Sequence, residues 1–561
     1  MYARVRIAGL ALIAALALVV AGCGGGGDDN GSTSGGGAGG GQEGGSISVL
    51  MGTAPDYLDP QLGYTTQSAE ATWISYTPLV TYRHATGEAG GELIPGLATA
   101  LPEVSRDGLT YTLTLRRGLR FSDGRPVRAS DFAYTIQRAI RLNWGGKSFY
   151  TNYIEGAADY DARRADAISG IQTDDATGRI AITLTEPYGA FGNVLAFPSS
   201  GLVPSGTPMR NLSNDPPPGV GPYMITNVSP NRGFTVERSP SFASLDIPDI
   251  PTGHLDTIRV TIVSNTQSEA QRVLNNEDDV FDAGDTLPPS ILPQIESQAS
   301  DRFSREAVPS TYYFLLNVTK PPFDDLRARQ AVNYAIDRDA MVRLASGFLE
   351  PSCWFIPEGL VGNPATELPD VRCPYGERPD IAKARALIRE AGLVGTRVVV
   401  WGQQRSPRRE YVDYWTDLLN EIGFDASERI IADEVYFPTI GSAETDPQTG
   451  FADWIQDFPN PADFYLLMDG RSIQPTNNQN FSKVNDPFIQ RELNRLNKVP
   501  TAELESVAED WARLDVYTAR RAYVAAYGAE LHPKFYSDRI DFDAAIFHPT
   551  YLNDWTSLRL K

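Results

Sequence analysis

The stretch LPEVSRDGLTYTLTLRRGLRFSDGRPVRASDFAYTIQRAI, residues 101–140, decides the fold prediction. Apolar residues alternate with threonine over residues 109–115, which is the period of a strand with one buried face. The dipeptide Asp123-Gly124 then favours a tight turn, because both residue types adopt positive φ readily. Ser130 is placed to cap a helix whose apolar side chains recur at every fourth position. The stretch therefore predicts a strand, a turn and a helix, in that order.

The order of the residues in this stretch resembles the pattern of family 5 extracellular solute-binding proteins, the peptide, nickel and opine receptors of ABC importers. That family carries DG-x-T-Y-x-h-x-L-R-x-G-h-x-F-x-DG-x-P-h-x-A-x-D-h, where h is an apolar residue. The matching residues here are Asp107-Gly108, Tyr111, Leu115-Arg116, Gly118, Phe121, Asp123-Gly124, Pro126, Ala129 and Asp131. Residues 329–338 are similar to a second family run, R-x-A-h-x-x-A-I-D-R. The resemblance extends over residues 47–555.

The resemblance implies an α/β fold of the bilobal, periplasmic-binding-protein-like type II kind, with an additional inserted domain. A chain of 561 residues is also long enough for more than one domain. Two crossing strands near residues 307–316 and 523–529 would form the hinge. The expected ranges are 47–88, 206–307 and 530–561 for lobe I, 89–205 for the inserted domain, and 308–529 for lobe II.

The composition describes an ordinary soluble globule, with 42% hydrophobic and 21% charged residues. The net charge of −21 argues against a nucleic-acid partner, because phosphate binding needs a basic surface. The four histidines are scattered without HExxH or paired-ligand spacing. We therefore expect no metal site, no cofactor and no catalytic residues.

The N-terminus has the pattern of a secretory signal. Arg4 and Arg6 precede an apolar run over residues 7–22, which is shorter than the roughly 20 residues that a membrane span needs. Val20-Ala21-Gly22-Cys23 resembles the bacterial lipobox, which implies cleavage after residue 22 and a Cys23 that carries diacylglycerol and palmitate. The alternative is an ordinary signal peptide with a chance cysteine. We expect a protein anchored by lipid to the outside of the cell membrane.

Residues 23–46 are expected to form a flexible tether. They are mostly Gly, Ser and small polar residues, which cannot bury enough surface to fold. Beyond the tether, Cys353 and Cys373 are close enough in sequence to form a disulfide in an oxidising compartment. Two free thiols are the alternative.

Residues 452–464, ADWIQDFPNPADF, are the most informative functional stretch. They look like the family's W-x-x-D-Y-x-x-P-x-x-F, in which the Asp after the Trp pairs with the α-ammonium of a bound peptide. The resemblance gives that position to Asp457, with Trp454 and Phe458 as apolar walls. A carboxylate in a closing cleft is costly unless a cation meets it, which would select a peptide N-terminus. The alternative is that Asp457 caps the turn before Pro459.

A basic residue after the strand at 397–401 can bind the ligand carboxylate in peptide receptors of this family. Arg405 is the preferred candidate among Arg405, Arg408 and Arg409, since guanidinium suits bidentate contacts. A solvated, basic helix start is the alternative. Further cleft candidates are Trp401, Tyr436 and the cluster Asn477, Asn478 and Asn480.

The predicted function is capture of an oligopeptide-like ligand between two lobes and its delivery to the permease subunits of an ABC importer. We expect a monomer without enzymatic activity. Another solute, such as a nickel chelate, a glycan or an opine, is the alternative within the family. An envelope enzyme or a structural lipoprotein that reuses the fold is the alternative from a different class.

Overall fold

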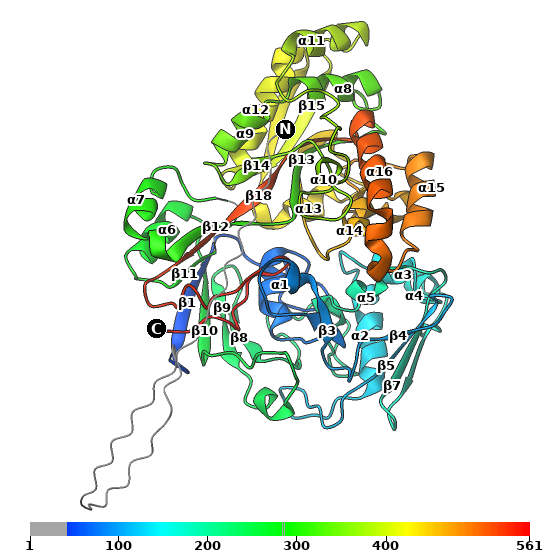
Figure 1. Ribbon diagram of the computed structural model, residues 1–561, viewed down its shortest axis with the longest axis vertical. Helices are drawn as coiled ribbons and strands as arrows, with labels where there is room; N and C mark the ends of the chain where they lie inside the picture. The colour runs from blue at the N-terminus through cyan, green and yellow to red at the C-terminus, as the bar shows by residue number, and fades with distance from the viewer. Residues whose placement is uncertain (1–41, 283, 285) are drawn as a thin grey trace, which may run out of the picture. The chain divides into compact units, whose positions relative to one another are not determined.

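A twelve-stranded mixed sheet runs through the computed structural model, which describes residues 42–282, 284 and 286–561 (Figure 1). Its strand order is β16-β15-β17-β13-β18-β11-β1-β10-β9-β8, and β12 and β14 also pair with β18. The predicted signal peptide (1–22), Cys23 and the start of the tether lie outside the described residues. Residues 42–46 are hydrogen-bonded into the fold, for example through the Gln42 amide, which donates to the Leu560 carbonyl at 2.9 Å.

The ranges predicted for lobe I, for the inserted domain and for lobe II each contain their own helices and strands. The ranges predicted for lobe I contain β1 (Ser46–Met51), α1 (Thr66–Trp73), β2 (Val80–Tyr82), β8 (Tyr223–Ser229), β9 (Gly233–Arg238), β10 (Thr257–Ile262), α6 (Thr266–Leu274), β11 (Val280–Asp282), α7 (Leu292–Gln298), β12 (Phe303–Ala307), β19 (Phe547–His548) and β20 (Leu552–Asn553). The segment 89–205 contains β3 (Leu93–Pro95), β4 (Glu103–Val104), β5 (Thr110–Thr114), α2 (Ala129–Arg141), α3 (Ser148–Thr151), α4 (Ala157–Asp161), β6 (Ile171–Asp174), β7 (Arg179–Thr183) and α5 (Phe191–Val194).

The range predicted for lobe II contains β13 (Ser310–Leu316), α8 (Leu326–Ala335), α9 (Arg338–Leu344), β14 (Leu349–Pro351), α10 (Pro364–Glu367), α11 (Ile381–Glu390), β15 (Arg397–Gln403), α12 (Arg408–Ile422), β16 (Asp425–Ile431), α13 (Asp433–Ile440), β17 (Thr449–Ile455), α14 (Pro461–Tyr465), α15 (Pro487–Leu496) and α16 (Ala508–Arg521). Strand β18 (Val524–Tyr536) follows. Short 3-10 helices are Gly87–Gly91, Pro198–Ser200, Phe242–Leu245, Ser300–Arg302, Leu466–Met468, Gly470–Ser472 and Thr501–Val507.

Strand β18 belongs to both halves of the sheet. Its first residues pair with β13, where Ala525 lies opposite Phe314, and its last residues pair with β11 and β12. Figure 1 shows it passing from β13 and β14 toward β12 and β11. Strand β13 falls in the predicted range 307–316, whereas β18 extends beyond the predicted 523–529 and pairs with β11 and β12 through residues 531–536. The hinge role of these strands and the domain limits stay predictions.

The segment 89–205 has its own antiparallel sheet, in the order β4-β5-β7-β6, with α2 against β6. Strand β5 confirms the alternating pattern, and Gly124 has the positive φ, 86°, that the predicted turn needs. The prediction of Ser130 as the cap of α2 is wrong. The helix begins at Ala129, so its N-cap is Arg128, whose amide donates to the Asp131 carboxylate at 2.8 Å; Ser130 lies inside the first turn, where its hydroxyl donates to Asp175.

The helices around β15 and β13 follow the sequence pattern closely. Helix α12 ends at Gly423, which has a φ of 116°, and packs the Trp415 ring on the Phe314 ring with 4.2 Å between centroids.

Cys353 and Cys373 form a disulfide with their Cα atoms 6.0 Å apart, which confirms the predicted pairing. Closing a loop of this length contributes about 3 kcal/mol to the free energy of unfolding.

Two kinds of feature are not found between residues 42 and 561, positions 283 and 285 aside. No helix there has the length and apolar character that crossing a bilayer requires. No group of three or more His, Cys, Asp or Glu side chains in the same residues is placed to hold a metal ion.

Candidate functional site

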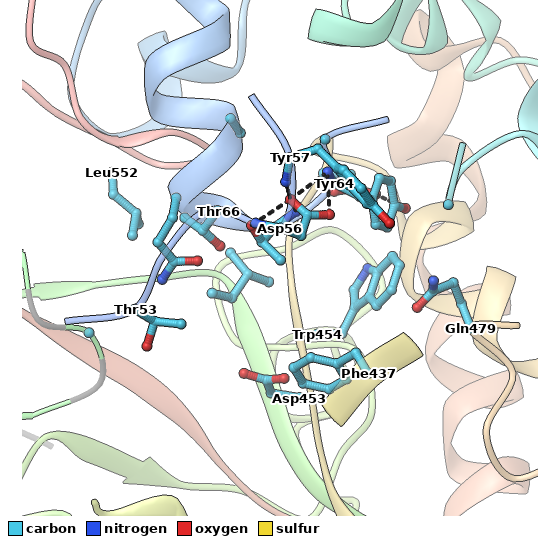
Figure 2. Close-up of a pocket in the computed structure, with 18 of the residues that line it drawn as sticks. Thr53, Asp56, Tyr57, Tyr64, Thr66, Phe437, Asp453, Trp454, Gln479 and Leu552 are labelled. Atoms are coloured by element: carbon cyan, nitrogen blue, oxygen red, sulfur yellow. Dashed lines mark hydrogen bonds between the residues drawn. The ribbon is translucent and has the colours of Figure 1, made fainter. Parts of the chain in front are cut away.

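A cavity that is partly open to solvent lies between segments that are far apart in the sequence. One wall comes from residues 53–72, the loop after β1 and the start of α1. The facing wall comes from residues 403–408, 433–438 and 453–457, at the ends of β15 and β17 and on α13. Figure 2 shows side chains from both walls, including Asp56 and Tyr64 from the first and Asp453 and Trp454 from the second.

Asp457 lines this cavity at the end of β17. The Tyr64 hydroxyl, from the opposite wall, donates to its Oδ2 at 2.7 Å. Among the described residues, the neutral Tyr64 phenol is the side-chain partner of the Asp457 carboxyl group. No ion pair there compensates the charge of this carboxyl group. Burial raises the pKa of Asp457 to about 7, since a charged carboxylate is poorly solvated there. The arrangement leaves a carboxyl group that a cation in the cavity could ionise and pair with.

Asp463 holds the backbone around Asp457 in place. Its carboxylate accepts the Asp457 amide at 2.8 Å and the Trp454 indole N–H at 3.1 Å. Burial, and then the nearby Asp457 carboxyl, raise the pKa of Asp463 well above its usual value. These bonds fix the loop after β17, so the direction of the Asp457 side chain is set by the fold.

Aromatic rings surround the Asp457 carboxyl group. The Tyr64 ring lies 5.4 Å from the Trp144 ring and 6.1 Å from the Trp454 ring, measured between centroids. All three residues line the cavity. The predicted position of Trp454 as an apolar wall therefore agrees with its place in the structure, while its contact with a ligand stays a prediction.

Asp56 orders the loop that carries Tyr64. Its carboxylate accepts the Tyr57 amide at 2.9 Å, the Tyr64 amide at 3.1 Å and the Thr65 hydroxyl at 2.9 Å (Figure 2). Burial raises the pKa of Asp56 to about 6, and these bonds oppose the shift. Tyr64 is thus held by Asp56 through its amide and reaches Asp457 through its hydroxyl.

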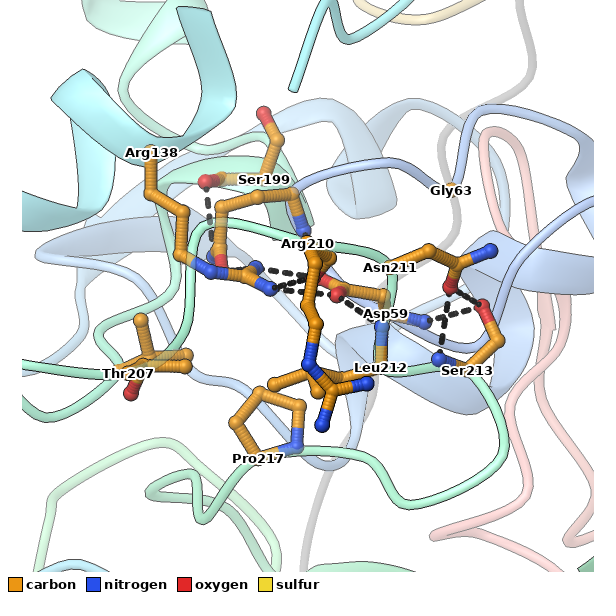
Figure 3. A network of polar contacts seen from close by, with 12 residues as sticks. Asp59, Gly63, Arg138, Ser199, Thr207, Arg210, Asn211, Leu212, Ser213 and Pro217 are labelled. Atoms are coloured by element: carbon orange, nitrogen blue, oxygen red, sulfur yellow. Dashed lines mark hydrogen bonds and ion pairs between the residues drawn. The ribbon is translucent and has the colours of Figure 1, made fainter. Parts of the chain in front are cut away.

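A buried ion pair attaches the same loop to the segment 89–205 (Figure 3). Arg138 of α2 donates to both oxygens of Asp59 at 2.6 Å and to the Gln61 side chain at 2.8 Å. Neither charged side chain of the pair is exposed to solvent. The Asp59 carboxylate also accepts the Leu212 amide at 2.9 Å. The first wall of the cavity is therefore supported by residues far from it in the sequence.

The three candidate arginines lie in different surroundings. Arg405 lines the cavity, with its Nε 3.9 Å from Asp433, and its guanidinium lies against Gly284. Arg408 also lines the cavity and pairs with Asp453 at 2.6 Å.

Arg409 is outside the lining, paired with Glu428 at 2.6 Å. The carboxylate-binding role of Arg405 stays a prediction.

Three other candidates lie behind the cavity wall. Tyr436 is buried and its hydroxyl donates to the carbonyls of Trp401 and Phe451 at 3.0 and 2.7 Å. Trp401 stacks under Arg429, 4.3 Å from ring centroid to guanidinium. Phe458 is fully buried against Phe149, 5.7 Å between ring centroids. These side chains point into the core, so we do not include them in a ligand-binding set.

The asparagine cluster divides in the same way. Asn477 lines the cavity and its side-chain amide donates to the Asn143 carbonyl at 2.9 Å. Asn478 and Asn480 are fully buried and bond to neighbouring backbone groups. Asn478 and Asn480 therefore hold the chain together locally.

Sequence reasoning missed the first wall of the cavity. Tyr64, Asp56 and Trp144 have no distinctive local pattern, and Tyr64 is 393 positions away from the aspartate that it bonds.

Comparison with known proteins gives relatives at the level of sequence. Glutathione-binding protein GsiB of Salmonella choleraesuis (strain SC-B67) is 28% identical over 331 residues, which are 58% of this chain and 58% of GsiB. GsiB of Escherichia coli O1:K1 / APEC is 28% identical over 335 residues with the same coverage. The matched region is thus less than two thirds of the length of these relatives.

Solved structures share the fold at lower identity. The clavulanic acid biosynthesis oligopeptide binding protein 2 has a TM-score of 0.80 at 24% identity, covering 92% of this chain and 96% of that one. Haemophilus influenzae OppA in complex with RPPGFSPFR has a TM-score of 0.78 at 18% identity, covering 93% and 99%. These likenesses confirm the predicted α/β fold of the type II periplasmic-binding-protein kind.

The family model of bacterial extracellular solute-binding proteins, family 5 (middle region), matches residues 92–475. That range holds both runs that suggested the family, residues 101–140 and 329–338, together with Asp457. It is more than half of the chain, and the chain belongs to the bacterial extracellular solute-binding proteins of family 5.

Proposed function

We propose that this protein captures an oligopeptide-like ligand between two lobes and delivers it to the permease of an ABC importer. The observation that carries the proposal is Asp457, a half-buried carboxyl group in a cavity between distant segments, bonded to a neutral tyrosine. The ligand's α-ammonium would pair with this carboxylate. The relatives named as glutathione-binding and the structural neighbours named as peptide-binding support a peptide-like ligand.

Closure of the lobes would couple binding to transport. Contacts such as Tyr64 to Asp457 exist only when the two walls of the cavity face each other. A ligand that touches both walls binds the closed form more tightly and shifts the balance toward it. The permease would then recognise that form, and the ligand would leave chemically unchanged.

The charge of the cavity supports a ligand with at least one positive group. Asp56, Asp433, Glu434, Asp453 and Asp457 all line it, and the lining arginines lie beside two of these acids. Of the two lining arginines, Arg405 is the proposed partner for a ligand carboxylate, because it follows β15 where the family resemblance implies a basic residue and because a guanidinium suits bidentate contacts. A nickel chelate, a glycan or an opine remains the alternative ligand.

Native mass spectrometry of the protein purified from its host tests the proposal. We expect a bound peptide-like molecule, released intact on denaturation. Recovery of a cleaved product would instead support an enzyme, and an unliganded protein that shows no compaction by small-angle scattering when peptides are added would support a structural role.

Binding should depend on pH with a maximum near neutrality. Burial raises the pKa of Asp457 to about 7, and a peptide α-ammonium loses its proton at about pH 8. The pair needs an ionised carboxyl and a protonated amine. From pH 7 to pH 5.5 the affinity should therefore fall roughly tenfold, as measured by calorimetric titration. An N-acetylated peptide, which lacks the ammonium, should show no such maximum; a shared profile would contradict the pairing.

We also propose that Cys23, outside the described residues, carries the lipid anchor. The Cys23→Ser variant should move from the membrane pellet to the soluble fraction, because one acylated cysteine supplies the membrane affinity. Fractionation with immunoblotting measures this. Ser32→Ala, in the same predicted tether, is the control, since it leaves Cys23 in place; retention of Cys23→Ser in the pellet would contradict the proposal.

A further inference from the structure

The segment 89–205 meets the predicted second lobe at a backbone contact that is centred on Gly189. The Gly189 amide donates to the Asn497 carbonyl at 2.7 Å, and the Thr501 hydroxyl donates to the Gly189 carbonyl at 2.9 Å. Neither these residues nor Val499 line the cavity. We call the set of Gly189, Asn497, Val499 and Thr501 the Gly189 contact.

The Gly189 contact leaves no room for a side chain. A Cβ atom on Gly189 would lie 1.7 Å from the Val499 carbonyl oxygen and 3.0 Å from the Pro500 nitrogen. The φ of Gly189 lies outside the left-handed region, so alanine is compatible with the backbone itself. The three atoms nearest to an alanine Cβ at this position therefore all belong to residues 499–500, on the other side of the contact.

The loop around Gly189 is rigid on its own side. The Tyr188 ring stacks on the Tyr153 ring with centroids 4.0 Å apart, and the Tyr111 hydroxyl donates to the Tyr188 carbonyl at 3.2 Å. The loop cannot easily retreat from a clash, because its neighbour is buried in the core of the segment 89–205.

Charged and apolar pairs flank the contact. Glu186 pairs with Arg471 at 2.9 Å and with Lys498 at 3.5 Å. Phe458, next to Asp457 in the chain, packs against Phe149. The interface between the segment 89–205 and the predicted second lobe, of which the Gly189 contact is one part, therefore runs from the surface to the edge of the cavity.

We propose that the Gly189 contact is a latch that stabilises the closed arrangement and so sets the affinity for every ligand. This inference rests on the proposed closure of two lobes. If only the closed form binds, the apparent affinity scales with the fraction of closed molecules. A weakened latch should lower the affinity for different ligands by the same factor, whereas a change at Asp457 should discriminate between ligands.

Hydrogen exchange of the full-length protein without ligand tests the latch directly. In Gly189→Ala, amide exchange in residues 185–190 and 496–501 should rise at least about tenfold, because the overpacked contact opens. Amide exchange in β7 should stay as it is in the wild-type protein. Thr501→Val, which removes one hydroxyl donor at an exposed position, should raise exchange about fivefold.

Binding of the nonapeptide RPPGFSPFR and of its N-acetylated copy supplies the second readout. Gly189→Ala should weaken both by the same factor. Gly192→Ala is the matched control, since its Cβ would meet a flexible Leu93 methyl group of the same segment at 3.3 Å. It should leave exchange and binding unchanged.

Unchanged exchange at residues 185–190 in both Gly189→Ala and Thr501→Val would overturn the latch, as would selective loss of one peptide. If the wild-type protein binds neither peptide, the proposed peptide-binding function fails. The exchange data would still decide the latch in that case.

Discussion

Asp457→Asn should lower the affinity for a peptide with a free α-ammonium by at least about thirtyfold, because removing one partner of a buried charge pair costs about 2 kcal/mol or more. The same variant should bind an N-acetylated copy of the peptide as before, since that copy has no α-ammonium to pair with the carboxylate. The amide is close in size to the carboxyl and can still accept from the Tyr64 hydroxyl, which keeps the walls of the cavity together. Calorimetric titration at pH 7 with RPPGFSPFR and its N-acetylated form measures both values.

Glu434→Gln is the matched control for this prediction. Glu434 also lines the cavity but is exposed at its edge, so its removal tests the general field of the acidic residues. We expect a change of threefold or less, about 0.6 kcal/mol, in the range for exposed charge pairs. Equal losses in both variants, or equal losses for both peptides, would show that Asp457 does not pair with the ammonium.

Arg138→Met should lower the free energy of unfolding by about 3 to 5 kcal/mol, because it leaves the buried Asp59 carboxylate without its cation. The pair is bidentate and neither side chain is exposed. The Asp59 carboxylate keeps the amides of Gln61 and Leu212 as donors, which places the loss at the lower end of that range. Denaturation in urea, followed by tryptophan fluorescence, measures the change.

Arg164→Met is the control for the buried pair. Arg164 pairs with Asp159 at 2.6 Å, but both side chains are more than half exposed. Its loss should cost about 1 kcal/mol or less. A similar small loss in Arg138→Met would mean that the Asp59 pair contributes little to the fold, and its role in supporting the loop of residues 53–65 would have to be abandoned.

The elements that the sequence predicted well are those with strong local signals. Helix α11 starts where Asp380 accepts the Lys383 amide at 2.9 Å, and α12 ends at Gly423; Asp before a helix and Gly after one are strong boundary signals in a sequence. The strand before it, β15, carries the expected apolar run. Ser130 shows the limit, because a competing acceptor from the β6–β7 turn takes its hydroxyl.

The cavity was harder to predict because it is made by packing between distant segments. The resemblance to the family pointed to Asp457, Trp454 and Arg405 as site residues. All three line the cavity. Trp401 and Tyr436 also lie on elements that border the cavity, yet the Tyr436 hydroxyl bonds to inward carbonyls. Whether a side chain at such a position faces the cavity or the core depends on its rotamer and its neighbours, which no local pattern specifies.

Strand β18 begins at Val524, near the end of a chain of 561 residues, and it is the strand that joins the two halves of the large sheet. Contacts between residues so distant in sequence form slowly, because a long loop must close first. The two halves cannot pair through β18 until residues 524–536 have left the ribosome. The timing of synthesis thus delays the final fold, which suits a member of an extracellular family that must be exported.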